Sequence, residues 1–141
     1  MREILFRGKR RDNREWVYGC YYKQTEFCGD KVEPFGIMII TSSESLCYDQ
    51  ALEYYAISEK TVGQFTGLTD KNGKKIFEGD IIEWFAQGES ERPDFGYIEY
   101  DEQSFAWRVC WQKYDPDWLE GMQSQYITVI GNVFDNKDLL S

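Results

Sequence analysis

The residues whose types could support chemistry lie in a glycine-rich central stretch, residues 61–83. The candidates are Thr66, Asp70, Glu78 and Asp80. Two neighbouring carboxylates can bind a divalent cation or act as a general acid and base. Asp70, however, begins the segment Asp-Lys-Asn-Gly, and Asp80 follows Gly79 directly before an apolar run. Asp side chains at such positions commonly accept hydrogen bonds from nearby backbone N–H groups. We therefore expect Asp70 to begin a turn and Asp80 to cap a bend, and we predict no catalytic or metal-binding residue.

Histidine and cysteine supply little catalytic chemistry in this chain. There is no His, and the four Cys lie at positions 20, 28, 47 and 110 without a C-x-x-C pair. Cys–His and Ser–His nucleophiles are therefore excluded, and the common zinc ligand sets do not fit this spacing. The Asp-Lys-Asn-Gly segment lacks the further acidic ligands of a calcium loop, and Gly-Gln-Phe-Thr-Gly-Leu lacks the lysine of a phosphate-binding loop. We expect no cofactor and no enzymatic activity.

A basic cluster near the N-terminus contrasts with an acidic chain. The net charge is −9, whereas residues 1–15 carry more cations than anions. The candidate binding residues are Arg7, Arg10, Arg11 and Arg14. Because turns are often rich in charged residues, we interpret this segment as a solvated hairpin loop. A nucleic-acid contact is the alternative, although an acidic body disfavours binding to phosphate backbones.

The composition is that of a β-rich domain with a core of its own. Of the 141 residues, 42% are hydrophobic and 17% aromatic, and aromatic side chains favour strands. The longest strongly apolar run, residues 37–40, is too short to cross a membrane. We recognise no secretory signal before the first expected strand, and so expect a cytoplasmic protein with free thiols.

Apolar patterning predicts seven to nine short strands and one or two short helices. The clearest strands are expected at residues 3–7, 15–23, 35–41, 54–57, 81–85, 96–100, 105–112 and 126–133. The first two should form a hairpin, and 96–100 should form another with 105–112. The continuous apolar run 35–41 should be buried on both faces. Residues 58–61 should form a turn or a one-turn helix, and 113–121 a turn that a short helix follows. Residues 48–55 allow either a short helix or a loop.

Glycine positions predict where the chain turns. Asn72-Gly73 favours a type I′ turn, because both central positions of that turn need positive φ. Gly79 should allow a sharp bend before the following strand, and Gly131 should interrupt the last one. The polar segment 87–95 should be an exposed loop. Together with the basic turn, it is where we would look for a functional surface.

Aromatic side chains on the expected strands could stack nucleic-acid bases or bind peptides. They are Trp16, Tyr18, Trp84, Phe85, Trp107 and Trp111. In residues 105–112, alternation places Phe105, Val109 and two tryptophans on one apolar face. Aromatic strand faces are more often core than binding surface. We therefore interpret these residues as core.

Three segments together resemble the YopX family, which is found largely in bacteriophages and prophages. They are REILFRGKR at the N-terminus, TVGQFTGLTDKNGKKIFEGDII in the centre and VIGNVFDNKDLL at the C-terminus. The resemblance spans nearly the whole chain and is least clear over residues 24–57. It implies a mostly β fold with a compact barrel-like or pseudo-barrel core, and self-association into a homo-oligomer. It brings no established activity and no agreed catalytic residues.

We therefore expect a single YopX-like domain over residues 1–141, divisible into an N-terminal β portion, 1–57, and a barrel-like core, 58–141. The hypothesis for function is a non-enzymatic phage or prophage accessory protein in the bacterial host. It would act as a protein-binding or assembly module with a phage or host protein. The alternative is a nucleic-acid-associated β-barrel module that uses the basic N-terminal turn.

Overall fold

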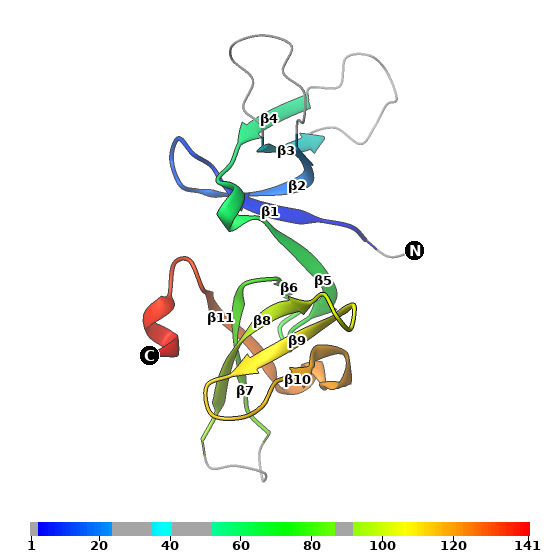
Figure 1. Cartoon of the computed structure of the whole chain (residues 1–141), viewed down its shortest axis with the longest axis vertical. Helices are drawn as coiled ribbons and strands as arrows, with labels where there is room; N and C mark the ends of the chain where they lie inside the picture. The colour runs from blue at the N-terminus through cyan, green and yellow to red at the C-terminus, as the bar shows by residue number, and fades with distance from the viewer. Residues whose placement is uncertain (1–2, 24–34, 41–51, 87–91) are drawn as a thin grey trace. The chain divides into compact units, whose positions relative to one another are not determined.

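A computed structural model describes residues 3–23, 35–40, 52–86 and 92–141 of the chain. These residues form eleven strands and four short 3₁₀ helices, so the chain is mostly β, as predicted (Figure 1). The chain divides into two compact units, residues 1–64 and 65–141, which we describe separately. The single-domain assignment and the division at residue 57 stay predictions. Among the described residues, no helix has the length and hydropathy needed to span a membrane.

Unit 1 is an antiparallel sheet. It contains β1 (Phe6–Lys9), β2 (Trp16–Lys23), β3 (Phe35–Ile40) and β4 (Leu52–Ala56), in the order β4-β3-β2-β1. The predicted N-terminal hairpin is confirmed, with Arg7 paired to Tyr18, although its first strand begins at Phe6 rather than at residue 3. The predicted strand 35–41 is confirmed over residues 35–40, and residue 41 lies outside the described ranges. The strand lies inside the sheet between β2 and β4, and Ile37 is fully buried.

Among the described residues of unit 1, Val17, Ile37 and Ile57 form a buried cluster. Partly buried Phe6, Tyr21, Tyr55 and Val62 pack against it. The single turn of helix η1 (Glu59–Thr61) follows β4 and confirms the turn predicted at 58–61. Of the segment 48–55, considered as a short helix or a loop, residues 48–51 lie outside the described residues. Residues 52–55 belong to β4, so a helix or loop is wrong there.

Strand β5 (Gly63–Thr69) belongs to both units. Its first two residues pair with β1, whereas Phe65 and Thr69 pair with β6 (Lys75–Phe77). The central glycine-rich stretch therefore contributes strands to each unit.

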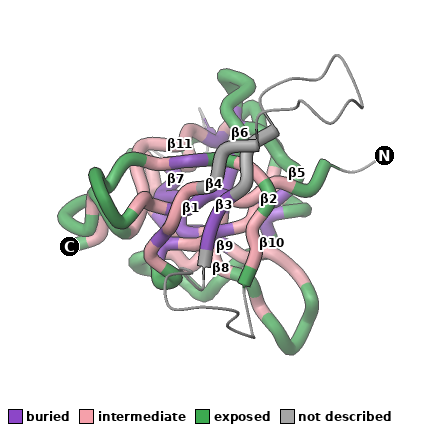
Figure 2. Tube along the Cα trace, turned by 90° about the horizontal axis from the view of Figure 1, so that it is seen from above, coloured by how far each residue is buried: buried purple, intermediate pink, exposed green. Residues whose placement is uncertain are grey.

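Unit 2 is built on a five-stranded antiparallel sheet. It contains β7 (Asp80–Trp84), β8 (Asp94–Asp101), β9 (Ala106–Trp111), β10 (Asp117–Trp118) and β11 (Ile127–Asn132), in the order β10-β9-β8-β7-β11. Its core contains Ile76, Ile82, Ile98, Val109, Leu119 and Ile127, among the residues coloured purple in Figure 2. Trp107 and Trp111 pack against this core, which confirms the predicted alternation for them. Phe105 departs from it, because it lies in the turn before β9 and is 81% exposed.

Three single helical turns occur among the described residues of unit 2, two between β10 and β11 and one after β11. They are η2 (Leu119–Gly121), η3 (Ser124–Tyr126) and η4 (Lys137–Leu140). With η1 they make four in the described part of the chain, rather than one or two. Each is only three or four residues long, too short to leave a helical pattern in the sequence.

The turn at Asp70–Gly73 corrects one prediction. Among the described non-glycine residues, only Arg14 and Phe105 have positive φ, so the φ of Asn72 is negative. The predicted type I′ turn is therefore wrong, because it needs positive φ at both central residues. Gly73 alone, with φ of 78°, adopts the left-handed conformation, and its N–H donates to the Asp70 carbonyl at 3.0 Å. This is the three-residue hairpin loop in which a type I turn is followed by a bulge glycine. The side chain of Asp70, described below, selects it.

Two other glycine predictions are confirmed. Gly79 has φ of 86°, a conformation that favours glycine, at the bend before β7. The pairing of β11 with β7 shifts register between Val129 and Gly131, which is the predicted interruption. Both sheets have open strand orders. Closure into a barrel therefore stays a prediction.

Candidate functional site

The central carboxylates support the fold rather than chemistry. Asp70 is buried, and its Oδ1 accepts hydrogen bonds from the backbone N–H groups of Asn72 and Lys74 at 2.8 and 3.0 Å. Its Oδ2 accepts a third from Val129 at 3.0 Å. Burial alone would raise the pKa of the Asp70 carboxyl, but these three bonds outweigh it and the pKa is lowered. Asp70 thus begins the turn, as predicted, and also ties it to β11.

Asp80 and Thr66 have similar structural roles. Asp80 is 1% exposed, and its Oδ2 accepts a hydrogen bond from the Phe77 N–H at 2.8 Å, which confirms the predicted cap. The Thr66 hydroxyl donates to the Ile76 carbonyl at 2.8 Å. Nowhere in the described ranges do three or more Cys, Asp or Glu side chains converge as a metal site would require.

The four arginines of the basic turn do not form one surface. Arg7 is 5% exposed and its guanidinium lies 4.5 Å from the centre of the Trp16 ring. Arg10 binds both carboxylate oxygens of Asp12, at 2.9 and 2.5 Å, and stacks over Tyr55. The hydrogen bonds that Arg10 donates to Asp12 raise the pKa of Arg10 and lower that of Asp12. Of the four arginines, only Arg11 and Arg14 are exposed.

An open pocket in unit 2 is the better candidate site. Strand pairing creates it, because Gly96 pairs with Trp111 and the Gln112 N–H donates to the Phe95 carbonyl at 3.3 Å. The start of β8 is therefore brought beside the end of β9 and the residues after it. The pocket has a volume of about 390 Å³, near the lower end for ligand sites. It is lined by Arg92, Pro93, Asp94, Phe95, Trp111, Gln112, Lys113 and Tyr114.

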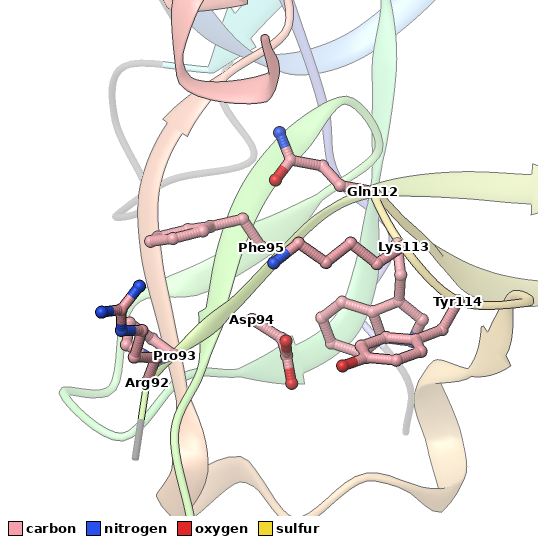
Figure 3. Close-up of a pocket in the computed structure, with 8 residues that line it drawn as sticks. Arg92, Pro93, Asp94, Phe95, Gln112, Lys113 and Tyr114 are labelled. Carbon is pink, nitrogen blue, oxygen red and sulfur yellow. The ribbon is translucent and has the colours of Figure 1, made fainter. Parts of the chain in front are cut away.

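The lining combines aromatic rings with charges of both signs. Figure 3 shows Lys113 extending toward Phe95, with the Asp94 carboxylate on the side of Tyr114. The Trp111 indole N–H donates to Asp117 Oδ2 at 2.8 Å, which fixes the orientation of the ring. Tyr114 is 61% exposed. Such a lining suits a ligand that has both an apolar part and a charged part.

Gly96 makes room for the pocket wall. A Cβ on Gly96 would lie 2.9 Å from Trp111 Cε3 and 2.7 Å from Val109 Cγ1. Both distances are shorter than van der Waals contact, so only glycine lets the indole lie against β8.

The face of the hairpin opposite to the Trp111 indole carries a polar network. Arg108 donates to Glu99 Oε2 through Nε and Nη2 at 2.9 and 2.7 Å, and the Cys110 thiol donates to the same oxygen at 3.2 Å. The hydrogen bonds from Arg108 and, to a smaller extent, from Cys110 lower the pKa of Glu99. Burial and, to a smaller extent, the hydrogen bond to Glu99 raise the pKa of Cys110. Cys110 is thus held as a thiol, which is a poor nucleophile. The network cross-links β8 and β9.

Sequence reasoning found part of this site. The segment 87–95 was predicted as a loop worth searching, and its residues 92–95 line the pocket, although Asp94 and Phe95 already belong to β8. Residues 87–91 lie outside the described ranges. Residues 112–114 were missed because nothing in their types indicates that strand register places them opposite Phe95. The nearest signal was Gly96, beside an aromatic-rich strand.

The strands define an all-β protein with two antiparallel sheets, and the second sheet carries the pocket. The chain belongs to the YopX family, because the family model described as YopX protein matches residues 5–141. Among solved structures, the chain is similar to protein EF1440 from Enterococcus faecalis. The two share 23% sequence identity over 100% of both chains, with a TM-score of 0.53. This similarity bears on the fold alone. Comparison with curated protein sequences gave no match.

Proposed function

We propose that this protein is a phage or prophage accessory factor that acts in the bacterial cytoplasm as a non-enzymatic protein-binding or assembly module. Its pocket would hold a side chain of a partner polypeptide. The single observation that carries the proposal is the pocket of about 390 Å³ built on β8 and β9. Family membership supports the phage-type origin.

The pocket lining favours a polypeptide partner. Aromatic residues and arginine are enriched at protein interfaces and dominate their energetics. Here three aromatic rings, from Phe95, Trp111 and Tyr114, stand beside cations and the anion Asp94. A peptide segment can satisfy both kinds of group, whereas a polyanion would meet Asp94 and a chain of net charge −9.

Selection from a displayed random peptide library, followed by calorimetry on the selected peptides, tests the proposal. Tyr114→Ala should weaken their binding by about tenfold or more, as expected for loss of an aromatic anchor. The matched control is Tyr18→Ala, which removes an exposed tyrosine of unit 1 and should leave affinity unchanged. A library that yields no binder, or binders that ignore Tyr114→Ala, would contradict the proposal.

A nucleic-acid-associated β-barrel module is the second candidate. Exposed Arg11 and Arg14 on the β1–β2 turn favour it. This candidate also assumes the barrel-like core that the family resemblance implies. Because binding would rest on phosphate contacts, it should be strongest at low salt. Filter binding of single-stranded DNA at low salt, with Arg11→Glu and Arg14→Glu together as the variant, decides it. Absence of binding by the unmodified chain would reject this candidate.

A further inference from the structure

An aromatic side chain projects from the end of the β8–β9 hairpin that is remote from the pocket. Phe105 is 81% exposed, the largest fraction among the exposed large hydrophobic residues of the described chain. Its φ is 54°, in the left-handed region that bulky residues seldom adopt. A glycine or asparagine would suit this backbone better. A strained and exposed phenylalanine is a reason to look for a contact that uses it.

The hairpin keeps Phe105 away from the pocket of its own chain. Regular pairing runs from Gly96–Trp111 to Asp101–Ala106. Five residue steps of antiparallel strand separate these pairs by about 17 Å. The Glu99–Arg108 contact and the edge-on stacking of Tyr100 on Trp107, at 5.0 Å between ring centres, tie the two strands together. Figure 1 shows β8 and β9 side by side, with the turn that joins them at the opposite end of β9 from the loop that leads to β10.

The two ends of the hairpin carry opposite net charge. The turn exposes the ring of Phe105, and residues 101–105 include the anions Asp101 and Glu102. The pocket has aromatic walls and carries the two cations Lys113 and Arg92 against the single anion Asp94. Its volume of about 390 Å³ is ample for one phenyl ring. An aromatic ring surrounded by aromatic walls, with ion pairs at the rim, is the usual composition of an interface hot spot.

We propose that Phe105 of one copy inserts into the pocket of a second copy, so that the chain assembles head to tail. This inference rests on the proposed function and names the partner as another molecule of the same chain. The interface joins two different surfaces, and it therefore forms a closed ring if the rotation between copies closes, or an open filament if it does not. The turn of each copy completes the pocket of its neighbour.

Phe105→Gly in the full-length chain provides the first test. Glycine removes the ring and relieves the positive φ, so the variant folds at least as well as the parent. Sedimentation velocity across a concentration series should show that the parent assembles. The variant should bind to itself at least about 30-fold more weakly. A parent that stays monomeric, or a Phe105→Gly variant that assembles equally well, overturns the inference.

Mixing two defective variants distinguishes head-to-tail assembly from a two-fold dimer. Phe105→Gly retains the pocket, whereas the double variant Lys113→Glu/Tyr114→Ala retains the projecting ring. Each should be monomeric alone, and the mixture should form a 1:1 heterodimer and nothing larger, because only one complementary pair remains. Absence of the heterodimer, or assembly of the pocket variant by itself, contradicts head-to-tail contact.

The peptide-library binding described above separates this inference from the proposed function. If selected peptides bind in a Tyr114-dependent manner while the parent chain is monomeric at every concentration, the pocket binds polypeptides and the self-assembly proposal falls. If the chain assembles through Phe105 and no library peptide binds, the proposed binding of other polypeptides falls and the contact between copies stands.

Discussion

Two regions of unit 2 contain similar polar groups and use them differently. At the Asp70–Gly73 turn, both carboxylate oxygens of Asp70 accept hydrogen bonds from backbone N–H groups. At the pocket, the charged side chains of Asp94 and Lys113 line open space beside aromatic rings. Asp70, which the sequence offers as a candidate for catalysis or metal binding, therefore stabilises the fold. The groups positioned to meet a ligand come in part from the segment 87–95, where a functional surface was expected, and in part from residues 112–114, whose types indicate no site.

Removing the Asp70 side chain should have the largest effect. Asp70→Ala leaves three backbone N–H groups without their acceptor, which should lower the free energy of unfolding by about 3 kcal/mol. Urea denaturation followed by tryptophan fluorescence measures the change. Asp115→Ala, at an exposed carboxylate after β9, is the matched control and should change stability little. Equal losses in both variants would contradict the structural role of Asp70.

Gly96→Ala should cause the next largest loss of stability, and it should disturb the wall of the pocket. The new Cβ would lie 2.9 Å from the Cys110 carbonyl oxygen as well as against Trp111, so the strands must shift. We expect a loss of about 2 kcal/mol, as for other overpacked sites, and a changed Trp111 environment in near-ultraviolet circular dichroism. Gly121→Ala, where no atom lies within 4 Å of the added Cβ, is the control.

Acid should weaken the Asp70 turn in a predictable window. The pKa of Asp70 is lowered in the folded chain, so below its ordinary value of 3.8 the unfolded state binds more protons. The stabilisation is therefore complete above that value and is lost as pH falls through the lower folded pKa. In Asp70→Asn, the dependence of unfolding free energy on pH should be shallower in this range than in the parent. Parallel pH profiles would show that Asp70 does not carry the effect.

Phe105→Gly should give the smallest change in stability, and with the opposite sign. Relief of the left-handed φ should raise the free energy of unfolding by up to about 1 kcal/mol, offset in part by the flexibility of glycine in the unfolded chain. Thermal unfolding at a concentration where the chain is monomeric measures it. Phe105→Ala serves as the control, because it removes the ring and keeps most of the strain. A clear loss of stability in Phe105→Gly would mean that the ring packs within its own chain.

Local patterns in the sequence predicted much of the fold. The apolar run 35–40 and the alternation of Trp107, Val109 and Trp111 predicted strands that the structure contains. Asn72-Gly73 predicted a turn but gave the wrong type, because the prediction considered backbone preference alone. Asp70 accepts hydrogen bonds from Asn72 and Lys74, which stabilises the wider loop with one left-handed residue.

The candidate site was harder to predict because it depends on register. Phe95 and Gln112 are brought together by the pairing of β8 with β9, and sequence patterns do not determine which residues face each other. Phe105 illustrates the same limit. Its place in the alternation predicted a core residue, whereas a positive φ at the end of the turn directs it to solvent.

The bond from the Val129 N–H to Asp70 has a consequence for solubility. Strand β11 is the last strand of its sheet, and its outer edge is occupied by this bond and by the bond from the Lys71 N–H to the Ile127 carbonyl. An uncovered strand edge can template pairing with strands of other molecules. The turn therefore works as a cover that blocks edge-to-edge aggregation. Loss of the Asp70 carboxylate should make the chain precipitate through β11 before its core unfolds.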